Sequence, residues 1–131
     1  CGLIETERNQ PLPERLLIIY NEIKGIIDKY NPEELAIEEL FFVKNVKTGI
    51  SVAHARGVAM LVAAQNNLKI FEYKPNEIKL GIAGYGHATK EQMRKMLSCH
   101  IKNCDIKQDD TADAVAIALT HLNRPKYNIK G

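Results

Sequence analysis

The apolar segment from Leu35 to Phe42 constrains the fold more than any other feature of the sequence. A short and mostly apolar run of this kind is typical of a sheet strand that is covered on both faces. An amphipathic repeat over Pro13–Tyr30 precedes it and predicts a helix. The pattern over Thr48–Asn66 is rich in small residues and predicts a helix that can pack closely on more than one side. A strand between two helices indicates an α/β layer architecture.

The second half of the chain continues this alternation. A strand is predicted over Leu68–Tyr73, and Pro75 favours a turn or a helix start just after it. Three glycines between positions 81 and 86 predict a loop, and a polar helix with a capping-box start follows over about Thr89–Cys99. The last helix begins near Asp109 and leads into a basic tail.

Size and composition predict one compact domain over residues 1–131, because 45% of these residues are apolar and can form a core. The longest uninterrupted apolar run is far shorter than the roughly 18 residues that a membrane span needs. Three cysteines without a Cys-x-x-Cys pair predict neither a disulfide framework nor a zinc site. We therefore expect a cytoplasmic protein that does not enter a membrane.

Charge is distributed unevenly along the chain. From Leu40 to Phe71 there is no acidic residue, although Lys44, Lys47, Arg56 and Lys69 lie there. Half of the sixteen acidic residues form two clusters: Glu33, Glu34, Glu38, Glu39, Asp105, Asp109, Asp110 and Asp113. Basic stretches beside concentrated carboxylates suit a metal site that handles phosphate. A mixed solvated surface is the alternative.

Glu38 is unusual because it interrupts the apolar segment, where burial of an ionised carboxylate is costly unless a cation compensates it. An edge position or a salt bridge with a lysine would also explain it. Asp110 and Asp113 are three residues apart and so share one face of the last helix's first turn. Helix capping is the alternative for this pair.

Together, these three carboxylates are hard oxygen donors of the kind that Mg²⁺ or Mn²⁺ binds, with no soft ligand nearby. Such a cluster supports two-metal hydrolysis of a phosphodiester. A glycosidase could also use paired acids, but the nearby basic stretches favour phosphate over a neutral sugar.

Three segments resemble the RuvC Holliday-junction resolvases: Ala36–Asn45, Ala55–Ala59 and Asp110–Ala118. The similarity extends over Pro13–His121 in the family's order and spacing. It implies a ribonuclease-H-like fold, in which helices flank a mixed sheet, and a homodimer. It also implies a Mg²⁺-dependent endonuclease, with two ions per site, that makes paired symmetric nicks in four-way junction DNA during recombination and repair. RuvA and RuvB, the branch-migration proteins, are the implied partners.

The same resemblance assigns roles to individual residues. Glu38, Asp110 and Asp113 match three metal-binding, catalytic carboxylates of the family. The implied DNA-binding positions are Phe41, Lys44, Asn45, Arg56, Lys79 and Lys90. Phe41 matches an aromatic residue that stacks on a base, and a core phenylalanine is its alternative. For Arg56, a phosphate contact and a buried structural pairing both stay open. For Lys79 and Lys90, a solvated surface position is the alternative.

The sequence departs from the family pattern at its start. Family members begin with a strand that carries an aspartate, in a pattern like Gly-Ile-Asp-Pro-Gly. This sequence opens at Cys1–Thr6, which resembles the family's third strand. By this comparison the first strands, and the first metal ligand, are not among the 131 residues.

Two rival interpretations remain. One is a non-catalytic module that binds junctions or other nucleic acids, and an Asp-bearing strand encoded upstream of Cys1 would argue against it. The other is a different ribonuclease-H-like nuclease, acting on RNA hybrids or as a transposase-type enzyme. Competition between four-way junctions, hybrids and linear duplexes would distinguish these substrates.

We expect a polypeptide of these 131 residues alone to be inactive or nearly so, because the loss of one carboxylate weakens metal binding and misplaces the attacking water. Mg²⁺-dependent cleavage of a synthetic four-way junction measures this directly. Turnover at ordinary resolvase rates would contradict the expectation.

Overall fold

The computed structural model describes residues 2–40, 45–84, 86, 88–100 and 109–125, and side chains are not described at 98–100 and 109. The chain divides into two compact units, which we describe separately. We refer to Gly2–Glu72 as the strand unit and to Tyr73–Gly131 as the helical unit. The single-domain organisation stays a prediction.

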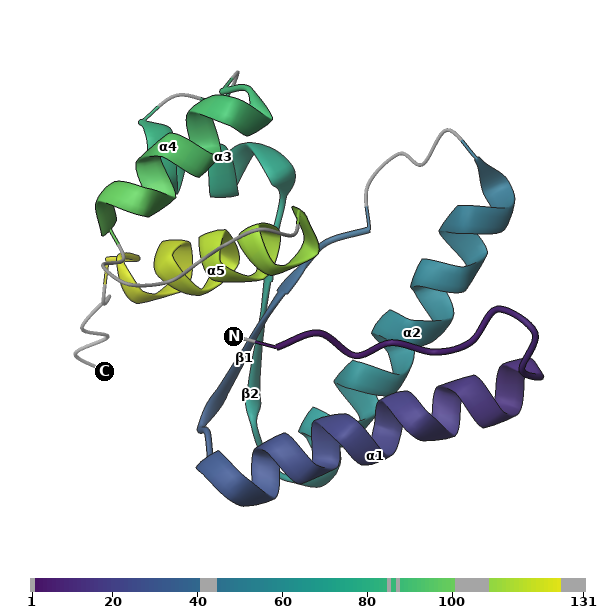
Figure 1. The fold of residues 1–131 in the computed structure, drawn as a ribbon. Helices are drawn as coiled ribbons and strands as arrows, with labels where there is room; N and C mark the ends of the chain where they lie inside the picture. The colour runs from purple at the N-terminus through teal and green to yellow at the C-terminus, as the bar shows by residue number, and fades with distance from the viewer. Residues whose placement is uncertain (1, 41–44, 85, 87, 101–108, 126–131) are drawn as a thin grey trace. The chain divides into compact units, whose positions relative to one another are not determined.

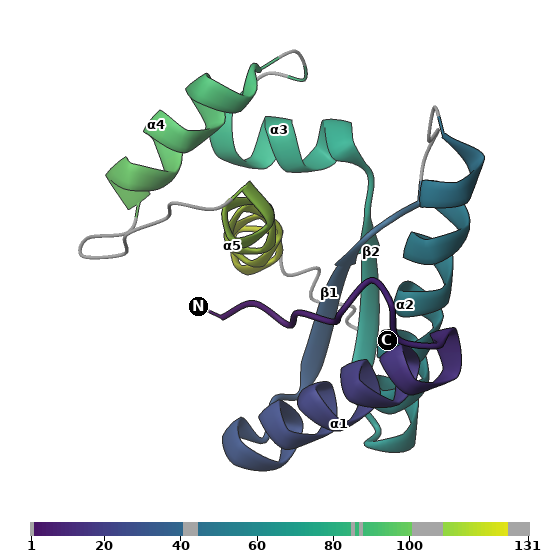
Figure 2. The same ribbon diagram turned by 45° about the vertical axis from the view of Figure 1, so that its right-hand side comes forward.

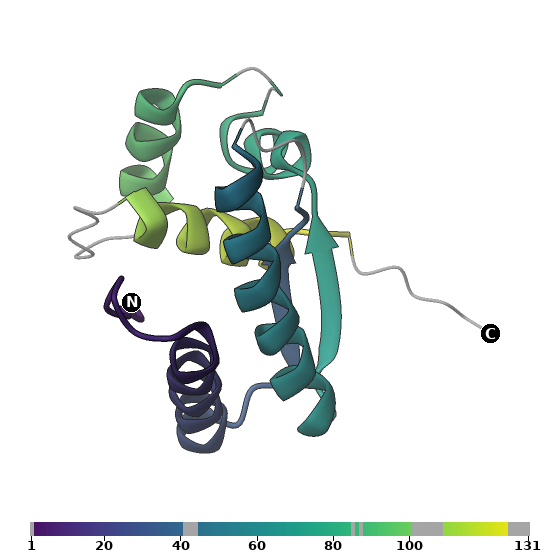
Figure 3. The ribbon, with the colours of Figure 1, turned by 90° about the vertical axis from the view of Figure 1, so that its right-hand side faces the viewer.

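The strand unit is built around a β-α-β arrangement. Its elements are α1 (Leu12–Tyr30), β1 (Glu34–Glu38), α2 (Val46–Gln65) and β2 (Lys69–Tyr73), whose last residue begins the helical unit. The strands form a two-stranded parallel sheet, and α2 is the crossover helix along one face of it (Figure 1 and Figure 3). The α/β class is therefore confirmed.

Local sequence sets the ends of both helices of the strand unit. Pro13 lies in the first turn of α1, and Asn31 ends this helix in the left-handed conformation, with φ of 45°. The Asn45 side chain caps α2 by accepting a hydrogen bond from the Lys47 amide at 3.0 Å. The two helices pack together, and the Tyr20 hydroxyl donates to Oε1 of Gln65 at 2.8 Å across their contact. Both predicted helices are confirmed within one to two residues.

The helical unit contains α3 (Pro75–Ala83), α4 (Lys90–His100) and α5 (Asp109–Leu122). Both α3 and α4 pack on α5, which Figure 2 shows nearly end-on. The buried residues of this core are Ile78, Ile82, Leu97, Ala112, Val115 and Ala116. Three of the six are small or β-branched residues of α5, which allow the neighbouring helices to approach it closely. Among the described residues, no helix has the length and apolar character that crossing a bilayer requires.

The loop prediction from Gly81 onward is wrong at its first position, because α3 continues to Ala83. The helix is favoured at its start by Glu77, whose Oε2 accepts a hydrogen bond from the Lys74 amide at 2.6 Å. It ends only at Gly84, which has a φ of 80° that glycine adopts readily. Gly81 is therefore a helical residue, present because its neighbour lies too close for a side chain.

Two strand predictions also need correction. The segment that resembles a third strand of the family, Cys1–Thr6, forms no strand over its described residues 2–6. A strand needs a hydrogen-bonded neighbour, and the sheet contains only β1 and β2 in the described chain. Likewise β1 ends at Glu38, earlier than the predicted end at Phe42, which lies outside the described residues.

We expect Gly81→Ala to destabilise the protein. An added Cβ would lie 2.7 Å from Oγ1 and 2.8 Å from Cγ2 of Thr120, whose side chain is buried and donates to the Ala116 carbonyl. Overpacking costs about 1–3 kcal/mol, and the helix propensity of alanine offsets up to about 1 kcal/mol of this. Chemical denaturation measures the free energy of unfolding.

Gly25→Ala in α1 is the matched control, because nothing lies within 4 Å of its added Cβ. This control should be neutral or stabilising. Equal free energies of unfolding for the two variants would show that the contact between α3 and α5 is looser than described.

Candidate functional site

Asp110 and Asp113 lie on the exposed side of the first turn of α5. The opposite side of the same helix is buried through Ala112, Val115 and Ala116, which form part of the core of the helical unit. The alternation follows from the helical period, since residues three apart share a face. Burial of the alanine side therefore directs both carboxylates outward as a pair, as their spacing predicts.

The surroundings of the Asp113 carboxyl disfavour its ionised form. Burial by surrounding protein atoms raises its pKa above the ordinary value of 3.8, and the nearby Asp110 carboxylate raises it further. Lys90 and Arg94 act in the opposite direction but do not cancel the rise. The Asp113 side chain is nevertheless partly open to solvent, so this burial is incomplete. A hard cation at this pair would relieve both the desolvation and the repulsion.

Local sequence also fixes the start of α4 and so the positions of its basic residues Lys90 and Arg94. The Thr89 amide donates to Oε1 of Gln92 at 2.9 Å, and the Gln92 amide donates to Oγ1 of Thr89 at 3.2 Å. This reciprocal capping box confirms the predicted helix start and makes Lys90 the first helical residue. Arg94 follows one turn later on the same face. Sequence reasoning missed Arg94, although its spacing of four from Lys90 was a usable signal.

Glu38 lies at the end of β1 and is exposed. The expectation that it interrupts a buried strand is therefore wrong, since the strand ends where the carboxylate begins to face solvent. An exposed ligand at the end of a strand has a low desolvation cost and can accept a cation from solution.

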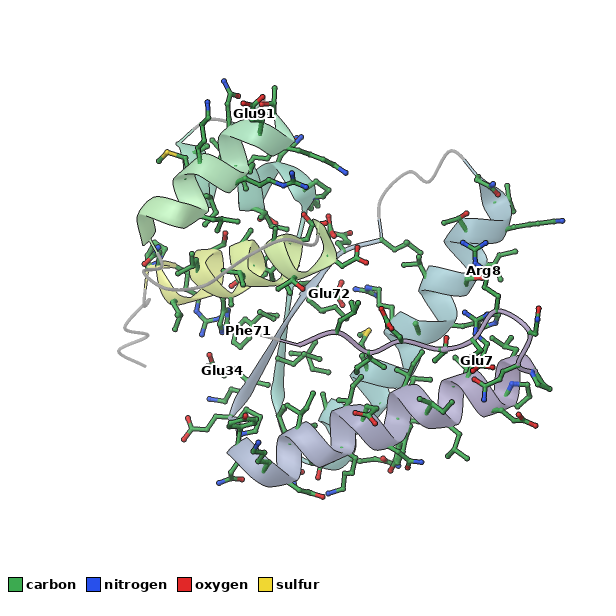
Figure 4. The ribbon with its side chains drawn as sticks, viewed as in Figure 1. Glu7, Arg8, Glu34, Phe71, Glu72 and Glu91 are labelled. Carbon is green, nitrogen blue, oxygen red and sulfur yellow. The ribbon has the colours of Figure 1, made fainter. Side chains whose placement is uncertain are left out.

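Arg56, on α2, contacts both strands of the sheet. Its Nε donates a hydrogen bond to the Glu38 carbonyl oxygen at 3.0 Å. Its Nη2 is buried and lies 2.9 Å from Oε2 of Glu72, an ion pair without hydrogen-bond alignment. Figure 4 labels Glu72 on β2. Of the two interpretations of Arg56, these contacts support the structural pairing.

The other predicted DNA-binding residues are distributed over both units. Asn45 is exposed, and its side-chain oxygen Oδ1 caps α2. Its Nδ2 is therefore the side-chain atom that can donate to a phosphate. Lys79 is half-buried on α3 and Lys90 is exposed on α4. Phe41 and Lys44 lie outside the described residues.

The three predicted metal ligands do not all belong to one unit. Glu38 belongs to the strand unit, whereas Asp110 and Asp113 belong to the helical unit. Among the described residues, no three His, Cys, Asp or Glu side chains are gathered so that they could hold a metal ion. The donor chemistry nevertheless fits a hard divalent cation, because every predicted ligand is a carboxylate and Asp110 raises the pKa of Asp113.

We expect Asp113→Asn to raise the melting temperature at neutral pH in metal-free buffer. Because the folded-state pKa lies above the ordinary value, folding penalises the ionised form of Asp113. This penalty is absent at a pH well below 3.8 and grows as the pH rises through the raised pKa. Asparagine cannot ionise and so avoids it.

Thermal denaturation of wild type and variant with EDTA, at neutral pH and near pH 3, measures the effect. The gain should be present at neutral pH and should vanish at acid pH. A gain of equal size at both pH values would show that ionisation of Asp113 is not its cause.

The family model described as "Crossover junction endodeoxyribonuclease RuvC" matches residues 1–121. Among similar proteins, RuvC of Brachyspira hyodysenteriae is 53% identical over 123 residues, which is 94% of this chain and 76% of the relative. RuvC of Alkaliphilus oremlandii is 50% identical over 127 residues, with 96% and 77% of the two chains covered. The chain therefore spans about three quarters of the length of these relatives.

Two solved structures of RuvC from Thermus thermophilus have a similar fold. One matches with a TM-score of 0.81 and 30% identity, and covers 91% of this chain and 72% of that chain. The other, in complex with a Holliday junction substrate, matches with a TM-score of 0.83 and 30% identity, and covers 91% and 73%. These matches confirm the predicted ribonuclease-H-like fold.

Proposed function

Because the chain belongs to the RuvC family of crossover junction endodeoxyribonucleases, we propose that Glu38, Asp110 and Asp113 are metal-binding carboxylates of its active site. The activity itself is that of a metal-dependent nuclease that resolves Holliday junctions. The observation that carries the assignment of the aspartates is their placement as an exposed pair in the first turn of α5, where burial and the Asp110 carboxylate raise the pKa of Asp113.

The metal in this proposal is Mg²⁺, with Mn²⁺ as a substitute, and two ions occupy each site. Bound cations would supply activation of water and stabilisation of the leaving oxygen of the phosphodiester. The contribution of the chain is to present oxygen donors. Asp110 and Asp113 do so from one helical turn, on a helix whose opposite side is fixed in a core. Glu38 does so from the end of a strand.

Lys90 is the basic residue whose proposed role has the most support. Its charge lowers the pKa of Asp113, so a phosphate near that carboxylate would also lie near the ammonium group. Arg94 acts on Asp113 in the same way, and we add it to the proposed DNA-facing residues. Phe41, Lys44, Asn45 and Lys79 stay proposals from the family resemblance.

The proposed substrate is four-way junction DNA, which the Thermus thermophilus relative binds in its complex. The homodimer, RuvA and RuvB are proposed as partners on family grounds. A homodimer is supported by exposed apolar side chains on α2, namely Val46, Ile50, Val52 and Leu61. A DNA substrate also supports the expectation of a cytoplasmic protein.

Membership of the RuvC family disfavours both rival interpretations. A module that only binds nucleic acid has no need for a second carboxylate beside Asp113 that raises its pKa. A nuclease for RNA hybrids or a transposase-type enzyme would share the fold but not the specific family match over residues 1–121.

In a full-length protein, we expect Glu38→Gln to abolish cutting and to leave junction binding largely intact. Glutamine removes the negative charge that holds the cation, and the loss of several kcal/mol of transition-state stabilisation corresponds to more than about a hundredfold in rate. Cleavage of a synthetic junction in Mg²⁺ and binding in EDTA measure the two effects separately.

Glu39→Gln is the matched control, because it removes the same charge one residue later and should retain most of the activity. If Glu38→Gln loses binding together with cutting, Glu38 is a structural residue and the assignment fails.

A further inference from the structure

We propose that Arg56 is a positioning residue for Glu38, which holds the carboxyl end of β1 in place for metal binding and does not contact DNA phosphate. The inference deepens the proposed function and rests on the assignment of Glu38 as a metal ligand. It concerns only contacts within the strand unit.

The guanidinium group of Arg56 makes three different contacts. Nε donates to the Glu38 carbonyl oxygen at 3.0 Å, and Nη2 lies 2.9 Å from Oε2 of Glu72. Nη1 lies 3.4 Å from the Met60 sulfur, one turn further along α2. One side chain on α2 is thus joined to the last residue of β1 and to β2.

Burial argues against a role of Arg56 in binding phosphate. Its side chain is 19% exposed, less than half the 41% of its partner Glu72. A phosphate contact through Nε or Nη2 would require that nitrogen to leave the Glu38 carbonyl or the Glu72 carboxylate. Nη2, the buried nitrogen, would then have to exchange a carboxylate for a phosphate at a position with little access.

The contact acts at the point where the strand no longer fixes the backbone. β1 ends at Glu38, and residues 39 and 40 are neither helix nor strand. The Glu38 carbonyl belongs to the same residue as the proposed ligand carboxylate, so holding the carbonyl limits rotation of the peptide that follows Cα. A misplacement of about 1 Å in a catalytic group can cost about a hundredfold in rate. Arg56 therefore controls where the Glu38 carboxylate can reach.

Arginine is required for this arrangement because its planar fork places several donors in fixed directions. A lysine ammonium is one compact charge and cannot meet the Glu38 carbonyl and the Glu72 carboxylate with the same geometry. Arg56→Lys and Arg56→Gln therefore separate the two roles. Lysine preserves a phosphate contact, whereas both substitutions remove the positioning contact.

The first measurement is junction binding by full-length protein in EDTA over a range of salt concentrations. The slope of log K against log salt concentration is negative, and loss of one phosphate contact lowers its magnitude by about 0.9. We expect both variants to keep the wild-type slope. A slope lowered by this amount in Arg56→Gln, and restored in Arg56→Lys, would overturn the proposal.

The second measurement is metal affinity without DNA, by calorimetric titration with Mg²⁺, together with the Mg²⁺ dependence of cleavage. Both Arg56 variants should bind Mg²⁺ about tenfold or more weakly and should reach a lower kcat at saturating metal, with KM for the junction unchanged. Glu72→Gln should give a smaller change in the same direction, since it removes the ion pair and leaves the hydrogen bond to the Glu38 carbonyl. Lys69→Gln, an exposed change on the same strand, is the control and should leave Mg²⁺ affinity unchanged.

The outcomes remain separable if an Arg56 variant unfolds, because Glu72→Gln perturbs the same ion pair with a milder change. Unchanged Mg²⁺ affinity in Glu72→Gln and in any folded Arg56 variant would overturn the positioning role. If Glu38→Gln itself leaves Mg²⁺ affinity unchanged, the proposed ligand assignment fails. If Glu38→Gln weakens binding while the Arg56 and Glu72 variants do not, only the present inference fails.

Discussion

The Arg56 guanidinium joins α2 to both strands of the strand unit, through the Glu38 carbonyl and the Glu72 carboxylate. A two-stranded sheet with one crossover helix has few backbone hydrogen bonds and is marginal in isolation. A partly buried charge on α2 that contacts both strands adds a side-chain connection between the helix and the sheet. It also places a hydrogen bond at the residue where β1 ends, so the architecture and the proposed site share one interaction.

The helical unit follows a different rule, in which small residues determine the position of charged ones. Ala112 and Ala116 let α5 pack closely within its core, and this packing fixes the rotation of the helix about its axis. The same rotation directs Asp110 and Asp113 outward. The capping box formed by Thr89 and Gln92 fixes the start of α4 independently. The positions of the charges around Asp113 therefore depend on the packing of α5 in its core and on the capping box at the start of α4.

Much of this arrangement could be predicted from the sequence because its determinants are local. The helix that ends at Asn31 and the cap at Thr89 follow from periodicity and short-range hydrogen bonds. The fold and the family followed from segments that resemble the RuvC resolvases, and the comparisons confirm both.

The errors and the open choices depended on partners distant in sequence. Gly81 was interpreted as a loop residue because its close neighbour, Thr120, cannot be inferred from local pattern. The two interpretations of Arg56 could not be separated because one of them required a partner on β2, Glu72. Glu38 was placed within a longer strand because an apolar run does not mark where pairing ends.

The close approach of Gly81 to Thr120 has a consequence for how such a sequence can change over time. A methyl group at position 81 would meet a buried, β-branched side chain that is already hydrogen-bonded to its own helix. Neither position can therefore evolve alone toward greater bulk. A lineage that gains a side chain at position 81 must first acquire a smaller one at position 120. We therefore expect these two positions, 39 residues apart, to change together.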